Sequence, residues 1–198
     1  MAVDFAEIKR LRELTGVGMT DAKKALVEAN GDFDKALEEM RKKGLTKAEK
    51  RGEREARAGV ISTYLHDNRI GVLLEVNSET DFVARNEMFA AVVKDIAMHI
   101  AASAPLYVTS NDIAEDVREA KRAEFVEKVK NEGKPENMVP QIVEGMLKKY
   151  FAEQCLMDQP FIKNPDQTVG QYVKENIAKL GENLVVRRFS RMALGEVE

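Results

Sequence analysis

The sequence VISTYLHDNRIGVLLEV, residues 60–76, changes the hydrophobic pattern of the chain from helical to alternating. Apolar and polar residues alternate on both sides of the turn-forming group His66-Asp67-Asn68. Alternation on both sides of a short turn is typical of a β-hairpin, because successive side chains of a strand point to opposite faces of a sheet. We therefore expect two antiparallel strands here, after a helical amino-terminal part.

Downstream of this hairpin the pattern returns to helical spacing. Cap-type residues at 78–81 close the second strand, and a strong apolar stripe then predicts a helix on one face of the sheet: Phe89, Val92, Val93, Ile96 and Ile100. Two further helical patterns are joined by Gly133-Lys134-Pro135, and they predict a helical hairpin over about 113–155.

The carboxy-terminal part adds one more helix and one more strand. Gln159-Pro160 and Asn164-Pro165 bound a predicted loop. Thr168 and Gln171 form a capping-box pattern, which predicts the start of a helix that reaches Leu180. The extended run 184–189 predicts a third strand. The fold class is therefore α+β, with a three-stranded antiparallel sheet packed with helices.

Residues 1–44 contain three short helical patterns, which predict a three-helix module. Behind Asp4, a predicted N-cap, the first apolar stripe consists of Phe5, Ile8, Leu11 and Leu14. Asn30-Gly31 is predicted to end the second helix, Asp32 to begin the third and Gly44 to end it.

A charged segment, residues 45–58, follows this module. Residues 41–57 carry eight basic and three acidic side chains and almost no large apolar ones, which favours a solvated helical linker to a core domain at 59–198. A nucleic-acid contact is the alternative interpretation. We favour the linker because no aromatic residue interleaves these charges to stack on bases.

The composition excludes several classes of protein. The chain has 198 residues and a net charge of −3, so it lacks the overall basic field of a protein that binds phosphate backbones, and we expect no direct nucleic-acid partner. Cys155 is the single cysteine, so an intramolecular disulfide framework is excluded. The amino terminus lacks an export-signal pattern, and no run approaches the about 18 apolar residues of a membrane span. We expect a cytoplasmic protein without a membrane partner.

The sequence offers no catalytic constellation. A phosphate-binding glycine loop lies between a strand and a helix, whereas Gly16-x-Gly18 lies between two predicted helices. Cys155 falls in or just after an apolar helical stripe, which favours a structural thiol. His99 belongs to the apolar face of its helix, which favours a packed and hydrogen-bonded imidazole. We therefore predict a protein that is not an enzyme and that has no metal or cofactor of its own.

One local feature is unusual. Phe82 and Val83 follow cap-type residues directly and precede the main helical stripe, so two large apolar side chains extend from the end of an element. An interface anchor and a hydrophobic staple into the local core explain this pattern equally well.

These residues, with others along the chain, resemble the bacterial translation elongation factor Ts family, the guanine-nucleotide exchange factors of elongation factor Tu. The most diagnostic stretch is residues 74–84, LEVNSETDFVA, and the resemblance also covers residues 11–32. In the carboxy-terminal part it covers Gln159-Pro160-Phe161, residues 168–170, Gly181-Glu182-Asn183 and Arg187-Arg188-Phe189.

The resemblance implies a ubiquitin-associated-like module at 1–44 that docks on elongation factor Tu in its GDP form. It also implies a wedge near the partner's Mg²⁺ site that promotes release of GDP and its exchange for GTP. The wedge segment is Thr80, Asp81, Phe82 and Val83. The implied partner-binding residues are Arg12, Val17, Met19, His66, Leu180 and Gly181.

The length of the chain departs from that of longer family members, which carry two copies of the sheet subdomain and place the histidine hairpin and the wedge in different copies. This chain has one copy that holds both, so we expect a homodimer through the core and dimerisation domain at 59–198, binding two partner molecules. Whether His66 and Phe82 of one chain contact the same partner molecule stays open. An alternative function, which rests on residues 1–43 alone, is an adaptor that binds peptides or ubiquitin-like proteins.

Overall fold

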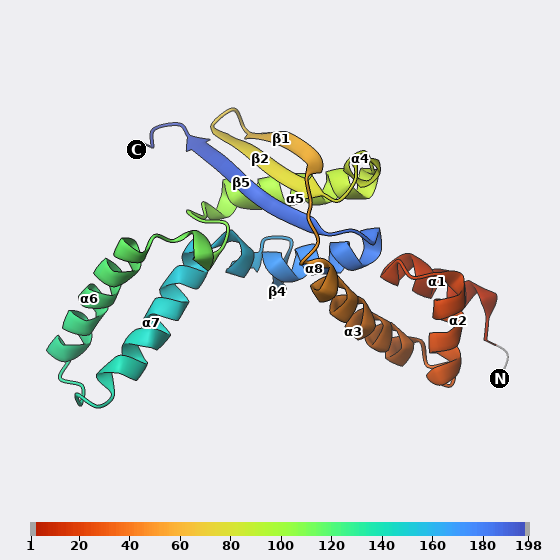
Figure 1. The fold of residues 1–198 in the computed structure, drawn as a ribbon, viewed down its shortest axis with the longest axis horizontal. Coiled ribbons are helices and arrows are strands. Elements are labelled where there is room, and N and C mark those ends of the chain that lie inside the picture. Colours follow the sequence, from red (N-terminus) through yellow and green to blue (C-terminus); the bar gives the residue numbers. More distant parts are fainter. Residues whose placement is uncertain (1–2, 197–198) are drawn as a thin grey trace.

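The computed structural model describes residues 3–196 as an α+β fold with three parts. Figure 1 shows a central sheet, an amino-terminal helical bundle on one side of it and a protruding helical hairpin on the other. The fold class predicted from the sequence is confirmed.

The bundle consists of α1 (Phe5–Thr15), α2 (Met19–Glu28) and α3 (Phe33–Arg51). Asp4 and Asp32 cap α1 and α3, because their carboxylates accept hydrogen bonds from backbone N–H groups within each first turn. The bundle buries a small core: Ile8, Leu11, Ala22, Ala25, Leu26, Ala29, Ala36 and Met40. The predicted α1 stripe is wrong at two residues, because Phe5 and Leu14 are exposed and do not belong to this core.

The prediction that Gly44 ends the third helix is wrong. The helix α3 continues seven residues further, to Arg51, and Ala48 in this extension is buried in the main core. A Cβ atom at Gly44 would come within 3.3 Å of the Cβ of Ala178 on α8. Glycine here therefore permits two helices to pack closely, and this packing offsets its helix-propensity cost of about 1 kcal/mol.

The sheet consists of β1 (Ala58–His66), β2 (Ile70–Ser78) and β5 (Leu184–Ala193), with β2 in the centre and both pairs antiparallel. Asp67 and Asn68 turn the β1–β2 hairpin with φ angles of 48° and 55°. Two successive left-handed residues form the turn that matches the twist of a hairpin. The predicted hairpin and third strand are confirmed.

One face of the sheet carries the main core. It is covered by α5 (Glu87–Ser103) and α8 (Val169–Leu180), whose apolar stripes pack against buried strand residues such as Leu74 and Val76. The Thr168–Gln171 capping box that begins α8 is confirmed. The opposite face of the sheet has exposed apolar side chains on all three strands, among them Ile61, Leu73 and Met192.

The helical hairpin consists of α6 (Glu115–Asn131) and α7 (Val139–Gln154), and it has an apolar cluster of its own. Cys155 is fully buried at its base, and burial raises the pKa of the thiol to about 11, as expected of a structural cysteine. The segment between Gln159-Pro160 and Asn164-Pro165, predicted to be a loop, instead belongs to a small two-stranded sheet.

The remaining elements are short. They are β3 (Pro160–Phe161), β4 (Asn164–Thr168), the helix α4 (Asp81–Ala84) and the 3₁₀ turns η1 (Ser110–Asp112) and η2 (Leu156–Asp158).

His99 is buried on α5, and both of its ring nitrogens have partners. Its Nε2 lies 2.9 Å from Oε1 of Gln159, and its Nδ1 accepts a hydrogen bond of 3.2 Å from the backbone N–H of Ile162. Because Nδ1 is an acceptor, Nε2 carries the proton of a neutral imidazole. Burial lowers the pKa of this imidazole below its ordinary value. The predicted packed and hydrogen-bonded role is confirmed.

This environment makes stability depend on pH. In the unfolded chain His99 takes up a proton near pH 6.5, whereas the folded chain resists protonation until lower pH. The unfolded state therefore binds more protons below pH 6.5. The contribution of His99 to the free energy of unfolding is fully present above this pH and is lost as the pH falls. Urea unfolding at pH 7.5 and 5.5 measures this loss. His99→Gln should reduce it and His66→Gln, which changes an exposed imidazole, should not; equal losses in all three proteins would contradict the assignment.

Candidate functional site

The short helix α4 presents the diagnostic segment at the end of the sheet. Thr80 lies two residues beyond the end of β2 and caps α4, because its Oγ1 accepts from the backbone N–H of Val83 at 3.4 Å. Val83 is buried, whereas Phe82 is 83% exposed. The two explanations that the sequence left equal therefore apply to different residues: Val83 is the hydrophobic staple, and Phe82 has the exposure of an interface anchor.

The corner that carries Phe82 is capped on both sides. Beyond α4, Oδ1 of Asn86 accepts from the backbone N–H of Met88 at 2.8 Å and begins α5. Asp81, Phe82, Arg85 and Asn86 line a shallow open hollow at this corner. An exposed aromatic ring thus shares this hollow with a carboxylate and a guanidinium, and capped helices stand on both sides of it.

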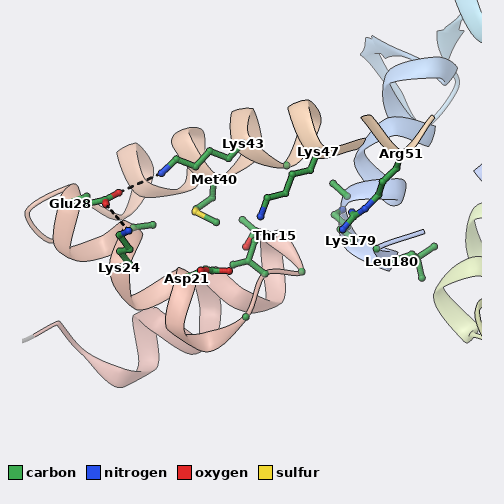
Figure 2. Close-up of a pocket in the computed structure, with 17 residues that line it drawn as sticks. Thr15, Asp21, Lys24, Glu28, Met40, Lys43, Lys47, Arg51, Lys179 and Leu180 are labelled. Carbon is green, nitrogen blue, oxygen red and sulfur yellow. Dashed lines mark hydrogen bonds and ion pairs between the residues drawn. The ribbon is translucent and has the colours of Figure 1, made fainter. Parts of the chain in front are cut away.

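A second candidate surface forms where the bundle meets α8. Gly16, in the α1–α2 turn, approaches α8 so closely that a Cβ atom there would lie 2.7 Å from the Cα of Lys179. Beside this contact, Val17, Leu180 and Gly181 line one cavity of about 420 Å³. Figure 2 shows the cavity between the bundle and the end of α8. Met19 is half-buried against the bundle core, and Arg12 is exposed on α1. The fold therefore brings Val17 together with Leu180 and Gly181, although about 160 residues separate them in the sequence.

The wall of this cavity is rich in cations. It carries Lys24, Lys43, Lys47, Arg51 and Lys179 against two carboxylates, Asp21 and Glu28. Glu28 pairs with Lys24 at 3.9 Å and with Lys43 at 3.5 Å, whereas within residues 3–196 Lys47 and Lys179 have no ion-pair partner. The cavity is therefore an electropositive groove.

The sequence analysis favours a solvated linker over a nucleic-acid contact at residues 45–58, and it therefore predicts no groove here. The signal was nevertheless present: Lys43, Lys47 and Arg51 are spaced four residues apart, which places them on one face of a helix. That face became visible as a site only when α3 proved to continue past Gly44.

His66 lies at the other end of the sheet from Phe82. It ends β1 at the hairpin turn, with 55% of its side chain exposed, and its Nδ1 lies 3.1 Å from the Tyr64 hydroxyl. Phe82 follows the opposite end of β2. The eight residue steps from Ile70 to Ser78 separate the two sites by about 25 Å, so the structure does not bring His66 and Phe82 of one chain together.

Comparison with known proteins identifies the family. A family model described as elongation factor TS matches residues 7–196. The chain belongs to the elongation factor Ts family. An elongation factor Ts of Geobacter sulfurreducens is 49% identical over 197 residues, which cover 99% of this chain and 91% of the relative. One of Thermodesulfovibrio yellowstonii is 48% identical over 198 residues, which cover 100% of this chain and 99% of the relative.

Membership in this family supports a role as a translation elongation factor in nucleotide exchange. The match spans both the bundle and the core domain, whereas the adaptor alternative rests on residues 1–43 alone. In the part of the chain that the structure describes, no helix is long and apolar enough to cross a membrane. Within the same residues no cluster of His, Cys, Asp and Glu side chains is suited to hold a metal ion.

The contact of Gly16 with α8 can be separated from backbone strain by a matched pair of variants. Gly16 and Gly31 both have left-handed φ angles, of 68° and 84°, but only at Gly16 would a Cβ atom meet another element. Gly31→Ala should cost about 1 kcal/mol of stability, and Gly16→Ala should cost more and loosen the bundle from α8.

Hydrogen–deuterium exchange of the amides of Leu180 and Gly181 measures this loosening. Exchange there should be faster in Gly16→Ala than in wild type and unchanged in Gly31→Ala. Equal protection in both variants would show that the contact does not hold the bundle in place.

Proposed function

We propose that this chain binds elongation factor Tu in its GDP form and promotes release of GDP and its exchange for GTP. It acts by protein–protein binding and performs no catalysis of its own, and the proposed place of action is the cytoplasm. The observation that carries the proposal is the 83% exposed Phe82 on a capped corner, within the segment most diagnostic of the family. Thr80, Asp81, Phe82 and Val83 form the proposed wedge.

The wedge has a physical basis in the free chain. Phe82 gives up little on docking, because its ring has no packed environment to lose and its backbone is already ordered. Burial of a phenylalanine side chain contributes about 2–3 kcal/mol. If this energy is gained only when a helix beside the partner's Mg²⁺ site has moved, binding of the wedge opposes the contacts that hold the ion and GDP.

Exchange of this kind consumes no energy of its own. A protein that weakens the affinity of its partner for GDP must itself be bound more weakly when GDP is present. The two affinities change by the same ratio. The chain therefore needs two contact regions: one that retains the partner throughout, and one that competes with the nucleotide.

We assign retention to the surface where the bundle meets α8. Arg12, Val17 and Met19 on the bundle, with Leu180 and Gly181, form the proposed docking surface. The adjoining groove is electropositive, which suits an acidic surface on the partner. The wedge at Phe82 would then be the competing region.

The outer face of the sheet supports a homodimer. The register places Ile61, Leu65, Leu73 and Met192 on the face opposite the core, and they are 66%, 63%, 49% and 75% exposed. An exposed apolar face of this kind, crossed by the ion pair of Glu75 with Arg188, is typical of an interface between subunits. We propose that two copies meet through this face.

The dimer also offers a role for His66. Consider a two-fold axis that lies midway between the two facing sheets and runs perpendicular to the strands. This axis would bring His66 of one copy to the end of the dimer that carries Phe82 of the other. One partner molecule would then contact Phe82 of one chain and His66 of the second.

The wedge is tested by release of fluorescently labelled GDP from elongation factor Tu. Phe82→Ala should reduce acceleration of release by at least about tenfold, because the burial energy of the ring is lost. Leu106→Ala, which truncates a residue that is 64% exposed elsewhere, is the matched control and should behave as wild type. A Phe82→Ala protein with full activity would contradict the proposed wedge.

The dimer is tested by sedimentation equilibrium. Wild type should be a dimer at micromolar concentrations, as expected of a specific interface. Leu73→Glu should be a monomer, because it places a charge in the centre of the apolar face. Leu106→Glu, which adds the same charge off the sheet, should remain a dimer. A monomeric wild type would overturn the proposed interface.

A further inference from the structure

The turn that carries Phe82 is tied to a distant loop by one carboxylate. Glu182, between α8 and β5, accepts two hydrogen bonds from Thr80: one of 3.0 Å from its backbone N–H and one of 2.6 Å from its hydroxyl. The two residues are 102 positions apart in the sequence. A carboxylate that accepts both donors of a single residue fixes the backbone and the side-chain rotamer of that residue together.

A second carboxylate makes the reciprocal connection. Oε1 of Glu79 accepts from the backbone N–H of Asn183 at 2.7 Å. The side chain of Asn183 in turn donates to the carbonyl of Arg54 at 2.7 Å, in the segment that follows α3. Ser78 and Leu184 are the last paired residues of β2 and β5 at this end of the sheet. The two carboxylates therefore join the segment after β2 to the segment before β5, just beyond the last residue pair of these strands.

The helix that carries Phe82 depends on this connection for its orientation. With four residues, α4 is too short to be stable alone. Its N-cap hydroxyl, Oγ1 of Thr80, accepts from Val83 while donating to Glu182. Removal of Glu182 would leave this hydroxyl free to rotate, and the cap of α4 would weaken.

The same carboxylate links the wedge to the docking surface. Glu182 follows Gly181 directly, and Leu180 and Gly181 line the groove at the end of α8. We infer that Glu182 is a positioning residue that holds Thr80, and through it Phe82, in fixed register with the groove. This inference rests on the proposed function, because it explains how binding at the groove directs the wedge.

A positioning role differs measurably from a structural one. Both bonds from Thr80 to Glu182 are exposed to solvent, so their loss should change the free energy of unfolding little. The maximal rate of GDP release should instead fall, because Phe82 samples more orientations in the complex. The concentration of factor for half-maximal release should be nearly unchanged, since the docking surface is intact.

The test compares Glu182→Ala with Glu127→Ala, which removes a charge from the exposed face of α6. Release of labelled GDP from elongation factor Tu is measured over a range of factor concentrations. Glu182→Ala should lower the maximal rate about tenfold, because a misplaced Phe82 ring loses part of its effect on the partner. Glu182→Gln, which keeps one acceptor oxygen, should restore part of this loss, and Glu127→Ala should match wild type.

A double variant shows whether Glu182 acts through Phe82. In the Phe82→Ala background, Glu182→Ala should cause no further loss, because the ring that it positions is absent. Additive losses would overturn the inference, and so would wild-type rates in Glu182→Ala.

Hydrogen–deuterium exchange of the free chain gives a readout that does not depend on the partner. The amides of Val83 and Ala84 should lose protection in Glu182→Ala and keep it in Glu127→Ala. Unchanged protection would overturn the positioning role even if wild type failed to accelerate release. That failure would by itself count against the proposed function, so the two are distinguishable.

Discussion

The position of α8 between the sheet and α3 is the constraint on which the candidate sites depend. One side of α8 places Val173 and Ile177 in the main core, and the other side meets Gly44 and Gly16 through Ala178 and Lys179. The end of α8 leads directly to Glu182 and its hydrogen bonds to Thr80. One helix, anchored in the core, therefore fixes both the bundle that would retain a partner and the turn that would act on its nucleotide site. Small residues at the two helix contacts permit this close packing.

Local patterns predicted the elements well, and contacts between distant segments were beyond them. The hairpin, the capping box at Thr168 and the role of His99 followed from spacing and residue type, because each is decided within a few neighbouring residues. The end of α3 was misplaced because the partner of Gly44 lies on α8, 134 positions away in the sequence. For the same reason, the pairing of Glu182 with Thr80 was not predicted: the two residues are 102 positions apart. The split between Phe82 and Val83 required coordinates, because the sequence alone does not say which side chain of a four-residue helix faces the core.

The charge of the molecule is unevenly distributed over its surface. The chain as a whole is slightly acidic, yet the groove between the bundle and α8 gathers five cations around two carboxylates. The separation of His66 and Phe82 at opposite ends of the sheet has a comparable consequence. At each end of the sheet a single chain presents only one of these two residues. In the proposed dimer, a second copy docked on the exposed apolar sheet face would supply the other residue at that end. Both features depend on contacts between segments that are far apart in the sequence, so they emerge only from the fold.

In the proposed mechanism, binding of this chain and binding of GDP to elongation factor Tu oppose each other. Titration calorimetry of the chain into nucleotide-free and GDP-saturated elongation factor Tu measures this coupling directly. Binding to the nucleotide-free form should be tighter, by the same ratio by which the chain weakens the affinity for GDP. Equal affinities for the two forms would contradict it, because a ligand without differential affinity cannot shift the exchange equilibrium.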